Sequence, residues 1–148
     1  MAGRITRGRR DPLTKPERSG QMSKVRSRGN RSTEMEVESL LLTFDIRGWV
    51  KHPNGVPGRP DFYFPRLSLA VFVDGCFWHS CPKCARNMPR ARRQFWANKL
   101  DENRRRDRRV RSQLRRQGVR TMRIWEHSAG TSKWLPRLTR MIKEQGTD

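Results

Sequence analysis

The sequence predicts an α/β domain in which helices flank a mixed β-sheet. Short runs of β-branched and aromatic residues alternate with longer segments whose apolar residues recur at helical spacing. The length of 148 residues is that of one domain, which can bury a core without several disulfides. Residues 1–31 are rich in arginine and poor in large apolar side chains, so they offer no core face. We therefore expect a flexible basic arm over residues 1–31 and a folded domain over residues 32–148.

The first expected helix begins at the capping residues Ser32 and Thr33 and stops near Gly48. Its apolar residues share one helical stripe: Val37, Leu40, Leu41 and Phe44. Turn formers then fill residues 52–60 and lead into a short strand over residues 61–64. After a turn at residues 65–66, the apolar and β-branched residues 67–73 indicate a buried central strand.

Residues 90–117 form the longest expected helix, and Gly118 is its C-terminal stop. Its outward face is dense in arginine, and its inward face would carry Phe95, Trp96, Leu100, Val110 and Leu114. Residues 119–124 predict another strand. A closing helix is indicated by apolar residues that share one side: Trp134, Leu135, Leu138, Met141 and Ile142. This order of helices and strands favours a mixed sheet covered by helices.

The charge of the chain points to a polyanionic partner. Lysine and arginine number 34 against 14 aspartates and glutamates, for a formal net charge of +20. No stretch is apolar enough to span a bilayer and no signal peptide opens the chain, so nucleic acid in the cytosol is favoured over a membrane. A ribosomal or nucleoid protein would have a similar composition, so charge alone leaves the activity open.

Three cysteines, Cys76, Cys81 and Cys84, lie within nine residues, and the last two form a C-x₂-C pair. An odd number of cysteines in a cytosolic protein argues against disulfides and favours metal binding. His127, directly after an expected strand, is the candidate fourth ligand. A closed Cys₃His set would be a structural zinc site. The alternative is three reduced thiols that bind no metal, with His127 on a surface turn.

Asp61 stands where a turn enters a core strand, and a carboxylate there suits a divalent cation that assists phosphodiester hydrolysis. Alternatively, Asp61 only ends the turn. The next expected strand runs into His79. Near a bound metal, His79 could accept a proton from the attacking water, because an unperturbed imidazole titrates close to working pH. A core or surface histidine is the alternative.

Phe77 and Trp78 are adjacent large aromatics beside His79, and one use of such a pair is as a wedge between base pairs. The alternative is that at least one of them packs in the core. Five arginines crowd the long expected helix too densely for ion pairing within the helix: Arg104, Arg105, Arg106, Arg108 and Arg109. We expect some of them to contact phosphates, with a solvated basic face as the alternative.

Several segments occur together over roughly residues 18–128: Gly58-Arg-Pro-Asp-Phe62, Val71-Phe-Val-Asp-Gly-Cys-Phe-Trp-His79, Phe95-Trp96 with Lys99 and Asn103, Arg106-Asp107, and Trp125-Glu126. In combination they resemble the very-short-patch mismatch repair (Vsr) endonucleases. The resemblance implies a restriction-endonuclease-like core. It also implies an enzyme that nicks one DNA strand next to a mispair, typically a T:G mispair left by deamination of 5-methylcytosine.

The resemblance assigns roles to individual catalytic residues. It implies that Asp61 is a ligand of a catalytic Mg²⁺ and that the backbone carbonyl of Val73 lies near the same cation. His79 would be the general base, and Asp107 would orient it.

Further residues follow from the same resemblance. Glu34 matches a glutamate of the first helix that lies near the metal, and Glu36 is a competing choice. Structural zinc ligands are implied at Cys76, Cys81, Cys84 and His127. Residues expected to contact DNA are Met22 of the arm, the wedge residues Phe77 and Trp78, and Trp96, Lys99, Arg108 and Arg109.

These features favour a mismatch-directed nicking enzyme that acts as a monomer on double-stranded DNA in the cytoplasmic nucleoid, with a functional link to a DNA cytosine methyltransferase. One alternative is a zinc-containing DNA-binding protein that does not cut. Another is a restriction or defence nuclease of the same fold without mismatch preference. Some family members carry Thr and His where this chain has Val73 and Asp74, so the metal ligands can differ here.

Overall fold

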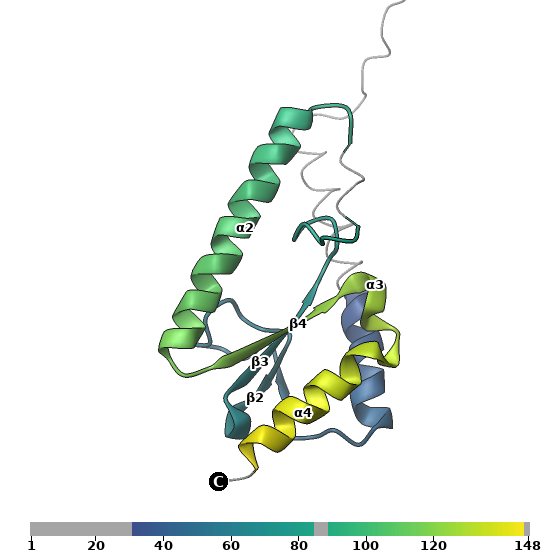
Figure 1. The fold of residues 1–148 in the computed structure, drawn as a ribbon, viewed down its shortest axis with the longest axis vertical. Helices are drawn as coiled ribbons and strands as arrows, with labels where there is room; N and C mark the ends of the chain where they lie inside the picture. The colour runs from purple at the N-terminus through teal and green to yellow at the C-terminus, as the bar shows by residue number, and fades with distance from the viewer. Residues whose placement is uncertain (1–30, 85–88, 147–148) are drawn as a thin grey trace, which may run out of the picture.

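The computed structural model describes residues 31–84 and 89–146, which form a sheet with helices on both sides (Figure 1). In this part of the chain the sheet has four strands in the order β1-β2-β3-β4. The strands are β1 (Val50–Lys51), β2 (Phe62–Phe64), β3 (Leu69–Asp74) and β4 (Arg120–Trp125). β1 and β3 are antiparallel to β2, whereas β3 and β4 are parallel, so the predicted mixed sheet is confirmed.

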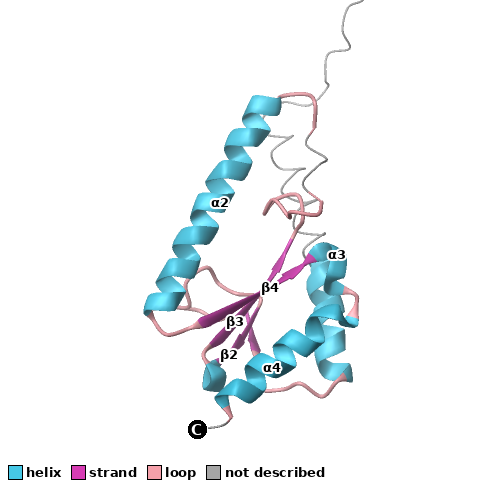
Figure 2. Ribbon diagram, viewed as in Figure 1, coloured by secondary structure: helices cyan, strands magenta, loops and turns pink. Residues whose placement is uncertain are grey.

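The parallel pair β3 and β4 needs a crossover, and helix α2 (Arg93–Arg116) supplies it along one side of the sheet (Figure 2). The other side is covered by the first helix (residues 31–43) and by α4 (Leu135–Gln145). The short helix α3 (Glu126–Ala129) follows β4 directly. The N-terminal end of α2 extends past the sheet, because 24 helical residues span about 36 Å whereas six strand residues span about 20 Å.

Alternation along the strands separates a core face from a polar face. The core face packs against the first helix and α4, and its buried side chains are Phe62, Phe64, Leu69, Val71, Val73, Met122 and Ile124. Phe72, Asp74 and Arg123 occupy the alternate positions and line a cavity on the side of α2. The face that does not carry the main core is therefore the one available for polar chemistry.

Two expected core residues lie at the surface instead. Phe44 is 55% exposed, because the first helix ends at residue 43 and Phe44 falls in the following turn. Phe95 is 48% exposed, because it lies in the part of α2 that extends past the sheet. Within the described residues, no helix combines the length and the apolar character needed to cross a membrane.

Candidate active site and zinc site

The carboxylate of Asp61 is fixed by the end of the β2–β3 ladder. The antiparallel register pairs Phe62 with Val71, and the residue before Asp61 is Pro60, which has no N–H to continue the pairing. The N–H of Val73 donates instead to Oδ2 of Asp61 at 2.6 Å. A backbone N–H at the end of the ladder thus holds the carboxylate in place.

The surroundings of Asp61 disfavour its ionised form when no cation is bound. Burial, the nearby Glu34 carboxylate and Asp74 together raise the pKa of Asp61 to about 8, although the hydrogen bond from Val73 opposes the rise. The ligand atoms of Glu34, His52 and Asp61 all lie within 4.8 Å of one another. A divalent cation would neutralise this cluster, and its carboxylate oxygens are ligands that Mg²⁺ accepts, so these residues fit a catalytic cation.

Glu34, and not Glu36, faces this cluster. Glu34 contacts His52, with 2.9 Å between Oε2 and Nε2. The Glu36 side chain lies beside Gly130 instead. A Cβ atom added to Gly130 would be 3.1 Å from Oε2 of Glu36. Of the two glutamates left open by the sequence, the geometry favours Glu34 at the metal site.

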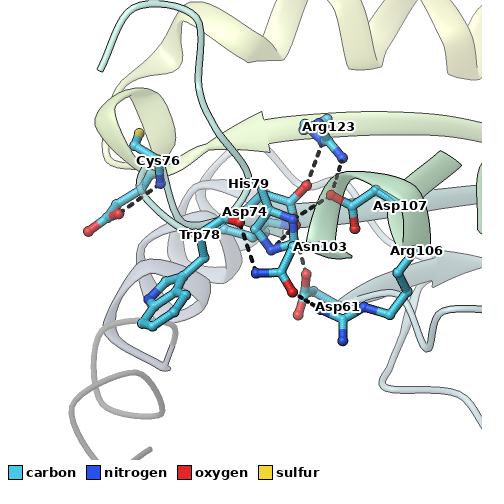
Figure 3. Close-up of polar contacts among 11 residues, drawn as sticks. Asp61, Asp74, Cys76, Trp78, His79, Asn103, Arg106, Asp107 and Arg123 are labelled. Carbon is cyan, nitrogen blue, oxygen red and sulfur yellow. Dashed lines mark hydrogen bonds and ion pairs between the residues drawn. The ribbon is translucent and has the colours of Figure 1, made fainter. Parts of the chain in front are cut away.

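His79 is held between two aspartates in the loop that follows β3 (Figure 3). Its Nδ1 lies 2.7 Å from Oδ2 of Asp107 on α2, and its Nε2 lies 3.6 Å from Oδ1 of Asp74 at the end of β3. Burial disfavours the ionised form of Asp107, but the hydrogen bond and charge of His79, with Arg123 and Arg106, outweigh it and lower the pKa. An ionised Asp107 can accept a hydrogen bond from the Nδ1–H of His79, which leaves Nε2 as the nitrogen with a free lone pair.

Arg123 joins the two aspartates that flank His79. Its Nε lies 2.5 Å from Oδ2 of Asp74, and a terminal guanidinium nitrogen lies 3.3 Å from Oδ2 of Asp107 (Figure 3). Burial still raises the pKa of Asp74, against the charges of His79 and Arg123. Sequence analysis did not single out Arg123 or His52. The available signal for Arg123 was a charged residue between the apolar residues Met122 and Ile124.

Two α2 residues tie the His79 loop to the helix. The buried Asn103 donates from Nδ2 to the carbonyl of Trp78 at 3.2 Å and accepts from Arg106 at 2.9 Å.

Asp61, Asp74, His79 and Asp107 all line one cavity of about 480 Å³. Among the described residues that cavity is also lined by five arginines: Arg59, Arg106, Arg111, Arg123 and Arg137. Its wall therefore combines carboxylates suited to a cation with guanidinium groups suited to phosphate.

A cluster of partly buried aromatic rings lies next to the His79 loop. Trp96 near the start of α2 is 5.5 Å from Phe77 and 5.8 Å from Trp78, measured between ring centroids. Phe77 and Trp78 are 5.2 Å apart. None of the three is fully buried, so neither Phe77 nor Trp78 belongs to the main core.

On α2, the other expected DNA contacts Lys99, Arg108 and Arg109 are exposed. Met22 lies outside the described residues.

The three cysteines and His127 converge although His127 is distant in sequence. The parallel register pairs Asp74 with Trp125, so the loop after β3 and helix α3 leave the sheet side by side. The Nδ1 of His127 lies 3.2 Å from the sulfur of Cys76, and 3.6 Å from each of those of Cys81 and Cys84. Ligands of a tetrahedral Zn²⁺ would stand about 3.6 Å apart for these atom types. The Cys₃His group can therefore hold zinc.

Without a cation, a thiolate at Cys76 is unfavourable. Burial raises the pKa of the Cys76 thiol to about 12, and the neighbouring cysteines add to the rise. Backbone bonds already fold the loop, since Cys81 donates to the carbonyl of Cys76 at 2.9 Å and Cys84 to that of Cys81 at 3.2 Å. Zinc would supply the charge that deprotonated cysteines require.

Partly buried carboxylates that could hold a cation, a histidine beside an aspartate and a strongly basic chain are the features of an enzyme that hydrolyses phosphodiesters. Comparison with known families agrees, because the family model for DNA mismatch endonuclease Vsr matches residues 10–86. The chain belongs to the Vsr family. It is therefore a DNA endonuclease, and family membership carries the restriction-endonuclease-like core that the sequence predicted.

Individual relatives support this assignment. The chain is 36% identical over 116 residues to a type II nicking enzyme, V.XorIIP, of Xanthomonas oryzae pv. oryzae, covering 78% of this chain and 84% of the relative. It is 34% identical over 116 residues to the DNA mismatch endonuclease Vsr of Escherichia coli, covering 78% and 73%. A type II nicking enzyme of Neisseria meningitidis, V.NmeDIP, is 32% identical over 118 residues, covering 79% and 78%.

Proposed function

We propose that this endonuclease nicks one strand of double-stranded DNA beside a T:G mispair, by Mg²⁺-dependent hydrolysis, as in very-short-patch repair. The observation that carries the proposal is one cavity shared by Asp61 and by the His79–Asp107 pair, next to a cluster of partly exposed aromatics. The relatives described as nicking enzymes and as a DNA mismatch endonuclease support the same activity.

In this mechanism Asp61 and the backbone carbonyl of Val73 would hold the Mg²⁺, with Glu34 beside them. When bound, the cation neutralises the charge that develops on the phosphate. His79 takes the proton of the attacking water through Nε2 while its Nδ1 donates to Asp107. Asp107 thus acts as a positioning residue that selects the tautomer of the base.

Recognition is assigned to the aromatic cluster and the basic surface. Phe77 and Trp78 would enter the stack beside the mispair, supported by Trp96, and Met22 of the arm over residues 1–31 would insert from the other groove. Lys99, Arg108 and Arg109 would contact phosphates and position the duplex. A structural Zn²⁺ on Cys76, Cys81, Cys84 and His127 would hold the loop that carries both wedge and base.

The cellular setting completes the proposal. A monomer would act on mispaired DNA in the cytoplasmic nucleoid, and a DNA cytosine methyltransferase would generate the 5-methylcytosine whose deamination gives T:G. A second candidate is a nuclease linked to restriction and without mismatch preference, since some relatives are described as type II nicking enzymes and not as mismatch endonucleases.

The test is a nicking assay with the purified chain and Mg²⁺ on duplexes that are matched, contain T:G or contain other mispairs. We expect one strand of the T:G duplex to be cut much faster than either strand of the matched duplex. Equal cutting of all duplexes would support the restriction-linked candidate. Binding without cutting would indicate a non-catalytic protein.

Two variants divide the mechanism. Asp61→Ala should abolish nicking and weaken Mg²⁺ binding, because it removes a charged ligand. His79→Ala should keep the cation and lose about 10²- to 10⁴-fold in rate, the usual contribution of a positioned general base. Both variants should still bind duplex DNA, which a gel-shift assay measures, and full nicking by purified Asp61→Ala would contradict the mechanism.

A further inference from the structure

His52 is brought to Asp61 by the shortest strand of the sheet. β1 pairs Lys51 with Phe62 in antiparallel register, so the next residue, His52, stands opposite Asp61. The N–H of His52 donates to the carbonyl oxygen of Asp61 at 3.3 Å. The backbone of His52 is thus hydrogen-bonded to the residue that carries the partly buried carboxylate.

The donor atoms of this group have the spacing of ligands around one ion. Nε2 of His52 lies 2.9 Å from Oε2 of Glu34, and these two atoms and the Asp61 carboxylate all lie within 4.8 Å of one another. Ligands at about 2.1 Å from an octahedral ion stand about 3.0 Å apart when adjacent and about 4.2 Å apart when opposite. The 4.8 Å limit exceeds the opposite-ligand separation by a few tenths of an ångström, so small side-chain shifts would bring all three side chains to one cation.

The backbone of His52 is held in an uncommon conformation. Its φ angle is +46°, in the left-handed region, and the following residue is Pro53, which disfavours helical conformations of either hand at the position before it. Such conformations persist where the surrounding structure enforces them, and they cluster at functional sites. The exposed ion pair between Lys51 and Glu38, at 2.8 Å, already links β1 to the first helix. A contact that only linked these two elements would therefore not require the uncommon backbone conformation of His52.

We propose that His52 is a direct ligand of the catalytic cation, beside Asp61 and Glu34, and that its imidazole makes the site prefer Mn²⁺ over Mg²⁺. Magnesium is a hard ion that favours oxygen ligands and gives up water reluctantly, whereas first-row transition ions gain affinity from an imidazole nitrogen. The inference rests on the proposed function only in taking this cluster as the catalytic cation site.

The experiment measures metal binding without DNA. The zinc-loaded full chain is titrated with Mn²⁺, and free Mn²⁺ is followed by electron paramagnetic resonance. Mg²⁺ affinity is then obtained by displacement of Mn²⁺. Pulsed measurement of electron spin-echo modulation detects whether a nitrogen nucleus is bound to the Mn²⁺. His52→Gln removes the imidazole and keeps a hydrogen-bonding side chain, and Lys51→Gln, in the same strand, is the matched control.

We expect a nitrogen signal in the unmodified chain and in His79→Ala, and none in His52→Gln. His52→Gln should weaken Mn²⁺ binding by about tenfold or more and Mg²⁺ binding by less than about threefold, so that the preference narrows. Lys51→Gln should change neither affinity. Circular dichroism checks folding, and His52→Ala provides a second variant.

Absence of a nitrogen signal in the unmodified chain would overturn the proposal, whatever the variants do. Equal weakening of both metals in His52→Gln, with the signal retained, would show that His52 only positions Glu34. Failure of nicking with an intact nitrogen signal would refute the proposed function and leave the ligand assignment standing, so the two failures can be told apart.

Discussion

The guanidinium of Arg123 and the carboxylate of Asp74 form an ion pair between the parallel strands β4 and β3, with 2.5 Å between Nε and Oδ2. Arg123 also reaches Asp107, and both aspartates contact His79. The position of the histidine therefore depends on a residue that does not touch it in the contacts described.

Arg123→Gln is expected to lower the free energy of unfolding by about 1–3 kcal/mol, because it leaves the buried Asp74 without its charged partner. Urea denaturation measures the loss. Arg105→Gln is the control, since its ion pair with Asp101 is exposed and should contribute less than about 0.5 kcal/mol. Equal effects of the two substitutions would mean that the Arg123 pair contributes no more than an exposed one.

Asp61→Asn is expected to stabilise the protein when Mg²⁺ and Mn²⁺ are absent. The amide can still accept the Val73 hydrogen bond, and it replaces a carboxyl whose ionisation is disfavoured by burial and by two nearby carboxylates. We expect a gain of about 1–3 kcal/mol. Calorimetry in metal-depleted buffer, with zinc retained, measures the change in Tm. Added Mg²⁺ should raise the Tm of the unmodified chain and not that of Asp61→Asn.

Asp45→Asn, at an exposed position, is the control for this experiment and should leave the Tm unchanged under both conditions. A lower Tm for Asp61→Asn in metal-depleted buffer would contradict the idea that the native site disfavours an ionised Asp61.

Asp107→Asn should make stability less dependent on acid pH. Because the folded-state pKa of Asp107 is lowered, its contribution is fully present above the unfolded-state pKa, which is about 3.9. That contribution is lost as pH falls through the folded-state pKa. The stability difference between the unmodified chain and Asp107→Asn should therefore be constant at about pH 6–7 and shrink below about pH 4.

Urea midpoints across this pH range test the prediction. Asp101→Asn, which alters a half-exposed aspartate of the same helix, is the comparison. A difference that grows on acidification would mean that Asp107 is not ionised in the native state.

Trp78→Ala should reduce discrimination between mispaired and matched duplexes more than it reduces overall binding. Unstacking a mispaired step costs less free energy than unstacking a matched step, by at most about a few kcal/mol. A wedge residue converts that difference into a preference for the mispaired duplex. Competition binding with T:G and matched duplexes measures the ratio. Phe95→Ala, an exposed ring at the edge of the cluster, is the control. Loss of folding in Trp78→Ala would identify the ring as structural.

Metal analysis should find about one Zn²⁺ per chain, and Cys81→Ala or His127→Ala should remove it with severe loss of stability. Structural zinc contributes on the order of 10 kcal/mol in small domains, which is comparable with the entire stability of a domain. Lys83→Ala, at an exposed position of the same loop, should keep the zinc. Full stability of a zinc-free Cys81→Ala protein would show that the thiols do not bind a structural ion.

The elements that could be predicted from sequence are those long enough to show a period. The helix ending at Arg116 and the strand containing Val71 and Val73 carry several turns or alternations of apolar residues, and both were placed within a few residues. β1 and α3 have two and four residues, so they show no period and were not predicted. β1 forms because Phe62–Phe64 needs an antiparallel neighbour on its open edge.

The candidate site divides in the same way. Asp61 and His79 were selected because each follows a recognisable local pattern, a turn before a strand and a cluster after one. His52 and Arg123 have no such pattern. Their partners Glu34 and Asp74 are 18 and 49 positions away. The packing of the first helix brings Glu34 to His52, and the strand register brings Asp74 to Arg123. Pairings fixed by register require the three-dimensional arrangement.

The hydrogen bond from Val73 to Asp61 comes from the main chain, and every residue except proline can supply it. Mutation can therefore exchange the side chain at position 73, within the limits of core packing, without releasing the Asp61 carboxylate. A hydrogen bond of this kind is insensitive to most substitutions at position 73. Val73→Pro is the substitution that removes the N–H itself, so it should release the Asp61 carboxylate.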